Sequence, residues 1–235
     1  MTAPTPDAST ASVDAVVPGS TARTRVRRLP EKAVHDRQAL YDVLDAGLVA
    51  HVALADDGQP YALPCAYARD GDTLLLHGST GSRLFRRLAD GDPVCVTVTL
   101  LDGLVYARSL FESSMQYRSA MVLGRAVPVP EEEKVAALLT LSARLLPGRV
   151  DEARGPSRKE LAATLVVRLP LTETSVKAAA GPPDDAAEDL GRPVWAGVLP
   201  LRTVAGDPVD APDLDPVRPV PDYVLDHPLR RAEAT

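Results

Sequence analysis

Short strand-like runs of mostly hydrophobic residues, separated by turn signals, follow one another through the first half of the chain. The first three such runs are 48–54, 61–69 and 73–77. An Asp-Asp-Gly turn at 56–58 separates the first two runs, and an Asp-Gly-Asp turn at 70–72 separates the second from the third. Because such turns favour tight hairpins, we expect these three strands to pair antiparallel.

Strand-like runs continue through the rest of the chain, and residues 94–100 alternate between hydrophobic and other side chains with a period of two. An Asp-Gly pair at 102–103 predicts a turn between two further strands. The later strand-like runs lie at 94–100, 104–111, 117–127, 164–169 and, more briefly, 194–201. Six or seven short antiparallel strands therefore account for most of the hydrophobic pattern.

Hydrophobic residues also recur with helical spacing in three places. One helix is expected from Glu31 to Leu44, with Gly47 as its stop, and a short one at 82–89. Three glutamates at 131–133 precede a third helix. Its expected buried stripe comprises Val135, Leu138, Leu139, Ser142, Leu145 and Leu146.

Together these elements predict an α+β protein in which antiparallel strands close into a small β-barrel with helices packed on it. Residues 1–24 are rich in Ala, Thr, Ser and Pro without a hydrophobic period, so we expect a disordered tail there. The proline-rich residues 203–235 are expected to form an extended arm. Residues 25–202 then make up the domain.

Composition narrows the classes of function. Of the 235 residues, 45% are hydrophobic and 25% charged, as in soluble globular proteins, and a net charge of −6 argues against a nucleic-acid surface. No apolar run reaches the roughly 18 residues that cross a membrane, and no signal-peptide pattern is present. We expect a cytoplasmic protein without a nucleic-acid or membrane partner.

Cys65 and Cys95 lie in expected strands without metal-ligand spacing, which favours reduced core thiols and no metal site.

The segment that follows the third expected strand carries candidate chemistry. His77 ends the strand, and a Gly-Ser-Thr-Gly-Ser turn at 78–82 leads into a helix that begins with Arg83. Unpaired backbone N–H groups at a helix start attract anions, and Arg83 adds positive charge. The turn therefore fits a phosphate, although glycine-rich turns also simply cap helices. Arg86 and Arg87, further along, fit a solvated helix face.

Several separated motifs resemble the pyridoxamine 5′-phosphate oxidase-like family of FMN-binding split barrels. Within that family, the chain looks most like the branch of nitroimidazole-resistance proteins and related flavin-nucleotide-binding proteins. The resemblance covers roughly residues 26–202, and its main motifs are Pro60–Pro64, His77–Arg83, Pro93–Val96, Tyr117–Ala126 and Val194–Leu201.

The resemblance implies a six-stranded antiparallel split β-barrel, an obligate homodimer and one FMN per subunit in the cleft between subunits. Groups on the turn after the third strand would bind the flavin phosphate, and the strand 61–67 with His77 would line the flavin ring. Residues 117–119 would approach the flavin from their own or the partner subunit. The implied cofactor-binding residues are Leu63, Pro64, His77, Ser79, Thr80, Ser82, Arg83, Tyr117, Arg118, Ser119 and Lys177.

The chain also departs from the family pattern. Residues 213–235 lack the arginine-rich segment by which the pyridoxamine phosphate oxidases proper hold their substrate, so that reaction is not expected. Arg83 stands where many relatives have lysine; either cation can meet a phosphate.

His77 is the candidate catalytic residue, because its imidazole could hydrogen-bond a flavin carbonyl or a substrate. The alternative is a structural histidine that caps the turn. His51, in the middle of a strand, is expected to be structural, and Trp195 is expected to anchor the C-terminal arm or, alternatively, to cover the cofactor.

Three functions follow. The first is an FMN-dependent oxidoreductase acting on a small molecule, in which the flavin performs the chemistry and the protein orients the reactants. The second is a non-catalytic binder or carrier of a flavin, haem or deazaflavin; haem would need His77 or His51 as an axial ligand. The third is a nitroimidazole reductase-type resistance protein.

Overall fold

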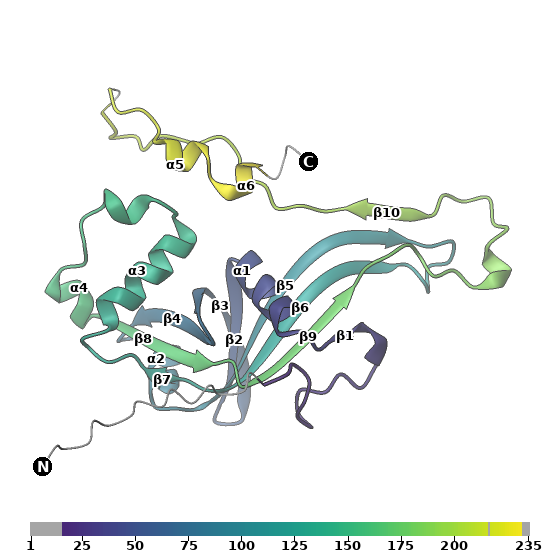
Figure 1. Ribbon diagram of the computed structural model, residues 1–235, viewed down its shortest axis with the longest axis horizontal. Helices are drawn as coiled ribbons and strands as arrows, with labels where there is room; N and C mark the ends of the chain where they lie inside the picture. Colours follow the sequence, from purple (N-terminus) through teal and green to yellow (C-terminus); the bar gives the residue numbers. More distant parts are fainter. Residues whose placement is uncertain (1–15, 216, 232–235) are drawn as a thin grey trace, which may run out of the picture.

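The computed structural model describes residues 16–215 and 217–231. Within them, ten strands form one strongly curved sheet (Figure 1). The strands are β1 (Ala33–Val34), β2 (Val49–Asp56), β3 (Gln59–Asp70), β4 (Thr73–Ser79), β5 (Pro93–Tyr106), β6 (Ser114–Arg125), β7 (Val127–Pro128), β8 (Thr164–Pro170), β9 (Glu173–Ala179) and β10 (Gly197–Pro200). Their order is β1-β9-β6-β5-β2-β3-β4-β8-β7, and β10 pairs with β5.

The helices of the described residues are short and lie around this sheet. The α-helices are α1 (Arg37–Ala46), α2 (Arg83–Ala89), α3 (Lys134–Leu145), α4 (Arg158–Ala162), α5 (Asp222–Leu225) and α6 (Pro228–Arg231). Three 3-10 turns, η1 (Pro30–Lys32), η2 (Arg149–Asp151) and η3 (Ala187–Asp189), complete the set. No helix among the described residues is both long and apolar enough to cross a membrane.

The predicted α+β split-barrel class is confirmed, although the sheet has more than six strands. Strand β9, which the hydrophobic pattern did not indicate, pairs with β6. The expected turn at 102–103 is wrong: β5 continues through it to Tyr106, and the pairing with β6 only shifts register between Leu101 and Gly103. A β-bulge absorbs the extra residue there, so the Asp-Gly pair bends the strand without reversing it.

The first predicted hairpin is confirmed residue by residue. Strands β2 and β3 pair from Val49 with Ala66 to Asp56 with Gln59. Asp57 and Gly58 both have positive φ, 48° and 81°. Two successive positive φ values are what a type I′ turn requires, and this turn matches the twist of the strands it joins.

The barrel opens where β3 leaves β4. Strand β3 pairs with β4 only over residues 67–70, although its first half, residues 59–66, pairs with β2. The other edge of that half is therefore an unpaired sheet edge. Pro60 and Pro64 lie in it, and prolines are typical of such edges because they donate no backbone hydrogen bond. The split lies between this edge and the end of β4.

Two hydrophobic cores lie on the two faces of the curved sheet. The larger core fills the barrel, and Leu40, Val43 and Leu44 of α1 close it. The smaller one lies between the outer face of the sheet and α3, where Ala137 and Leu141 contact Ala68, Leu75 and Val166. Each fully buried leucine contributes roughly 1.5–3 kcal/mol.

The expected stripe of α3 is partly wrong. Ala137 and Leu141 are buried, whereas Leu139 is 44% exposed and Leu146, just beyond the helix, is 57% exposed. The helix therefore presents a second apolar face that no element of the described chain covers completely.

Helix α1 starts later than predicted, at Arg37, because residues 33–34 pair with β9 as β1. Asp36 caps the helix and accepts hydrogen bonds from the backbone N–H groups of Gln38 and Ala39. This cap explains the later start, since a side chain that satisfies the first N–H groups fixes where a helix begins.

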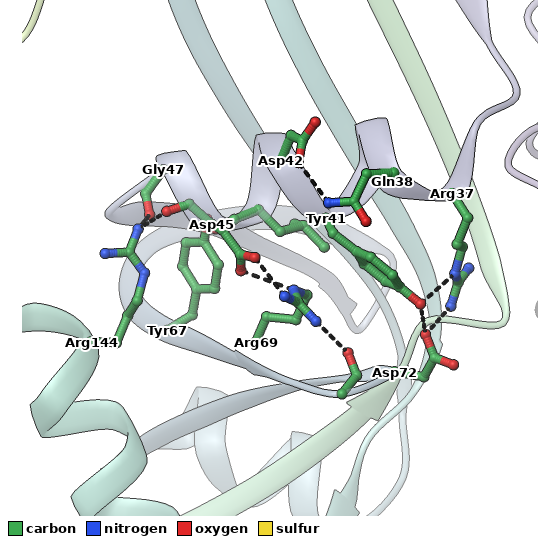
Figure 2. A network of polar contacts seen from close by, with 12 residues as sticks. Arg37, Gln38, Tyr41, Asp42, Asp45, Gly47, Tyr67, Arg69, Asp72 and Arg144 are labelled. Carbon is green, nitrogen blue, oxygen red and sulfur yellow. Dashed lines mark hydrogen bonds and ion pairs between the residues drawn. The ribbon is translucent and has the colours of Figure 1, made fainter.

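Polar contacts hold α1 in the barrel mouth (Figure 2). The buried Tyr67 hydroxyl donates to the carbonyl of Leu44 at 2.5 Å. Arg144 of α3 donates to the carbonyls of Asp45 and Gly47. The unpaired carbonyls at the end of α1 are thereby satisfied, and α3 is tied to the barrel.

At the other end of α1, aromatic and charged groups share one cluster. Arg37 binds Asp72 at 2.7 Å, and Tyr41 donates to the same carboxylate. Arg69 lies over the Tyr41 ring, 4.4 Å from its centroid, and pairs with Asp45. Hydrogen bonds from Tyr41 and Arg37 hold the pKa of Asp72 below its usual value.

The N-terminal segment becomes ordered earlier than predicted. Residues 1–15 of the expected tail lie outside the described residues, but 16–24 pack on the sheet. Gly19 N–H donates to Thr174 O at 2.7 Å, Thr24 is buried, and Arg23 pairs with Glu173. Backbone pairing with β9 orders residues 16–24, and amino-acid composition gives no sign of such pairing.

Replacing Tyr67 by Phe should lower the free energy of unfolding by about 1–2 kcal/mol, because the buried carbonyl of Leu44 loses its donor. The matched control is Tyr106→Phe, since the hydroxyl of the exposed Tyr106 makes no hydrogen bond within the described residues. Chemical denaturation measures both. Equal stability of the two variants would contradict this account of the α1 terminus.

Candidate functional site

The turn between β4 and α2 is held together by its own hydrogen bonds. The Ser79 hydroxyl accepts from Gly81 N–H at 3.1 Å, and Ser82 N–H donates to Ser79 O at 2.9 Å. The Ser82 side chain caps α2 by accepting from Phe85 N–H. Thr80 is exposed, and its hydroxyl meets no partner among the described residues. The predicted phosphate-binding turn thus exists as a compact, exposed loop.

Arg83 leans from α2 toward the β2–β3 hairpin. Its guanidinium pairs with Asp56 at 2.9 Å and lies over the Tyr61 ring, 4.8 Å from the centroid. The side chain remains 65% exposed, so an anion at the turn can still reach it. Asp56 also pairs with Arg87, which is therefore not simply solvated as expected.

The predicted Leu63 and Pro64 lie on the unpaired edge of β3, and both are exposed. Tyr61, on the same strand, has a buried hydroxyl without a hydrogen-bond partner among the described residues. A buried donor that the protein leaves unpaired is costly. The split therefore combines an exposed edge with a buried hydroxyl that has no hydrogen-bond partner among the described residues.

His77 lies outside the barrel, on the α3 side of β4. Side chains alternate along a strand, so His77 shares its face with Leu75, which packs toward α3, while Leu74 and Leu76 point into the barrel. Gly78 faces Phe85 so closely that a Cβ there would come within 2.2 Å of the ring. By the same alternation, Ser79 lies on the outer face with His77.

A cavity of about 600 Å³ opens beside His77. Its apolar wall comes from α3 and the segment after it, including Leu138, Leu139, Leu146 and Val150. Arg149, Arg154 and Glu160 lie at its polar margin. A volume of this size is within the range of small-molecule and cofactor sites.

The His77 imidazole is electrically neutral and unpaired. Its Nδ1 is buried and has no hydrogen-bond partner among the described residues. Burial lowers the pKa of the ring below its usual value of 6.5, so the uncharged form dominates at neutral pH. A neutral imidazole with a free lone pair beside an apolar cavity suits a metal of a bound cofactor or a hydrogen-bond donor.

The remaining predicted residues lie on other strands. Tyr117 and Ser119 of β6 and Lys177 of β9 are on the outer face, because their neighbours Ala120 and Val176 point into the barrel. Ser119 Oγ donates to Lys177 O at 3.4 Å. Arg118 points to the opposite side and forms a bidentate pair with Asp102.

These predicted residues therefore form two groups. One surrounds the split at Pro64, His77 and Ser79; the other is on β6 and β9. Four strand-to-strand steps separate β4 from β6, roughly 19 Å along the sheet. Because the sheet curls, outer faces so far apart turn away from each other. The two groups therefore lie on different parts of the outer surface of the sheet.

His51 is exposed on β2 and lines a different cavity, of about 610 Å³, with Val49, Leu101 and Leu229.

Trp195 is 68% exposed and tilts against Tyr106, with 5.6 Å between ring centroids. It packs on β5 rather than being buried beneath the arm. Cys65 and Cys95 are free thiols, and burial raises the pKa of both.

Sequence reasoning missed the cavity wall. The signal was present in the hydrophobic stripe of α3, whose Leu138, Leu139, Ser142 and Leu146 line the cavity. Hydrophobic periodicity predicts a core stripe here, because it does not say whether a helix face meets protein or a ligand.

No cluster of three or more metal-ligating side chains occurs within the described part of the chain.

The fold and the site define a class: an antiparallel split barrel with a hydroxyl-rich turn at the split. Residues 36–178 match the family model described as pyridoxamine 5′-phosphate oxidase. The chain belongs to this family, as its motifs indicated. Among curated proteins, none matches the sequence significantly.

Two solved structures are similar over nearly their whole length. The FAD and heme binding protein from Mycobacterium smegmatis is 46% identical, with 83% of this chain and 96% of that one covered, at a TM-score of 0.81. The flavocytochrome Anf3 from Azotobacter vinelandii is 38% identical, with 89% and 97% covered, at 0.83.

A 5-nitroimidazole antibiotic resistance protein from Bacteroides thetaiotaomicron, described as putative, is more distant. It is 24% identical, with 62% of this chain and 86% of that one covered, at a TM-score of 0.54. This likeness concerns the fold alone.

Stability should fall below pH 6.5 because of His77. The unfolded chain binds a proton as the pH drops through 6.5, the usual pKa, but the folded chain binds it only at lower pH, so protonation favours unfolding. The slope for one proton is at most about 1.4 kcal/mol per pH unit. Denaturation of His77→Gln should show a shallower loss just below pH 6.5; an unchanged slope would contradict the burial of the ring.

Proposed function

We propose that the chain is a flavin-binding redox protein that carries haem as a second cofactor. The observation that carries the proposal is His77, a neutral and unpaired imidazole beside an apolar cavity, in a family member whose similar structures include an FAD and heme binding protein. The flavin would transfer electrons, and the chain would bind and orient the reactants.

For the flavin, the split supplies the groups that the ligand needs. Ser79, Thr80 and Ser82 offer hydroxyls around the exposed turn, and Arg83 offers a cation for a phosphate. The unpaired Tyr61 hydroxyl and the exposed edge at Leu63 and Pro64 suit the polar rim and apolar face of the flavin ring. FMN satisfies these contacts, and so does the FMN half of FAD.

For haem, the cavity supplies a different set of groups. His77 would bind the haem iron, the leucines of α3 would contact the macrocycle, and Arg149 and Arg154 at the margin would meet its carboxylates. His51 is the weaker ligand because it is exposed and lies in the other cavity. The structure thus favours one of the two histidines that the sequence left open.

We also propose that the protein is a homodimer. The second group of predicted flavin-binding residues, Tyr117, Ser119 and Lys177, lies too far around the sheet to meet the split of its own chain. A second copy can bring that group to the first copy's split. Each dimer would then have two equivalent sites.

The purified protein should be yellow, and its flavin spectrum should bleach on reduction. Arg83→Gln should weaken flavin binding about tenfold, because a charge-assisted hydrogen bond to the phosphate is lost. Arg86→Gln is the matched control, since Arg86 is exposed on the same helix and has no ion pair within the described residues. Fluorescence titration with FMN and FAD measures both.

The flavin hypothesis is wrong if the protein takes up neither flavin at micromolar concentration. Reduction of the bound flavin by a nicotinamide donor, followed by reoxidation with a small acceptor, supports an oxidoreductase. Tight binding without such turnover supports a carrier.

Added haem should produce a Soret band that His77→Ala abolishes and His51→Ala retains, because only His77 faces the apolar cavity. The flavin spectrum of both variants should match that of the unmodified chain. A Soret band that survives His77→Ala, or disappears with His51→Ala, would place the haem elsewhere.

A further inference from the structure

Two oppositely charged segments lie on opposite sides of the molecule. The basic segment, residues 23–32, contains five cations and one glutamate. The acidic arm, residues 206–222, contains five aspartates and one arginine. Figure 1 shows the basic segment beside β1, below the sheet, and the arm above α1 and α3.

Most charges of the basic segment have no partner. Arg23 pairs with Glu173, but Arg25, Arg27, Arg28 and Lys32 form no ion pair with any described residue. Elsewhere on the barrel, exposed arginines such as Arg83 and Arg118 do pair with carboxylates. Four unpaired cations within eight residues are therefore unusual for this acidic protein.

The backbone beneath these cations is held in place. Gly19 N–H donates to Thr174 O of β9, Thr24 is buried, and β1 pairs with β9 immediately after the segment. Lys177 Nζ donates to Arg28 O at 3.3 Å. Leu29 has a positive φ of 56°, an uncommon conformation for leucine. The cations thus project from an ordered surface, not from a loose tail.

The acidic arm is anchored at both ends and exposed between them. Leu201 N–H binds Asp102 O at 2.9 Å, and Tyr223 packs beside Gly148 and donates to Glu152. Between these anchors, Val209 is 93% and Val217 83% exposed. Such exposure of apolar side chains is typical of a surface that another protein covers.

The carboxylates of the arm are equally free of cations. Asp207 pairs with Arg230, whereas Asp210, Asp213 and Asp222 form no ion pair with any described residue. The Asp215 carboxylate accepts the backbone N–H of Val217 and forms no ion pair with any described residue. The unpaired acids and the unpaired bases are thus complementary in sign, but they cannot meet within one chain because the sheet lies between them.

We infer that the acidic arm of one copy docks on the basic segment of a second copy. A two-fold dimer would form this contact twice, since the same pair of surfaces is present on both copies. The inference rests on the proposed homodimer and names the surfaces that hold it together. Exposed charge pairs are weakened by salt, so the dimer should dissociate more readily at high ionic strength.

Charge reversal tests the contact. Arg27→Glu/Arg28→Glu and Asp213→Lys/Asp215→Lys should each weaken the dimer about tenfold or more, because each of two contacts loses attractions and gains repulsions. A mixture of the two variants should restore the dimer, since each arm again meets a segment of opposite sign. The control is Arg158→Glu/Lys159→Glu, which reverses exposed cations on α4. Analytical ultracentrifugation measures the dissociation constants.

Disulfide trapping gives a second readout that does not depend on charge. Chains with Arg27→Cys are mixed with chains carrying Asp213→Cys and oxidised; a covalent dimer that requires both variants supports the inference. Cys65 and Cys95 are controlled for by the unmodified chain. A dimer with neither cross-link nor charge effect overturns the inference and leaves the homodimer standing. A chain that is monomeric at every concentration overturns both.

Discussion

Strand β4 is buried on both faces, and the arrangement of the site depends on this constraint. Leu74 and Leu76 must point into the barrel, so Leu75 packs toward α3, and His77 follows it to the same side. A shift of one residue would place the imidazole in the barrel core and a leucine in the cavity. Because both faces are filled, no such shift is tolerated, and His77 is held at the margin between core and cavity.

Helix α3 has two roles, and the burial of both faces of β4 connects them. One face fills the smaller core against Leu75 and Val166, and the other forms the wall of the cavity. Arg144 ties its C-terminal end to the carbonyls of α1, which closes the barrel. The wall of the site is therefore supported by the smaller core between α3 and the sheet, which suits a binding site that must keep its shape without ligand.

Two segments near the ends of the chain carry like charges that have no ion-pair partner among the described residues. Many arginines on the barrel pair with carboxylates that the fold brings near them, as Arg37 and Arg69 do around Tyr41. The N-terminal segment and the C-terminal arm instead keep charges of opposite sign unpaired. In the proposed homodimer, these two segments would recruit the second copy.

The sequence by itself determined the elements with local causes: the β2–β3 turn, where Asp57 and Gly58 supply two positive φ values, and the start of α2, where Ser82 supplies a cap. Its motifs also indicated the family. Contacts between distant segments decide that β5 runs through Asp102, that residues 16–24 pack on the sheet, and that half of the α3 stripe faces a cavity. The physical reason is the same in each case. Turns and caps depend on neighbouring residues, whereas strand pairing and the choice between core and cavity depend on what distant segments bring to the other side.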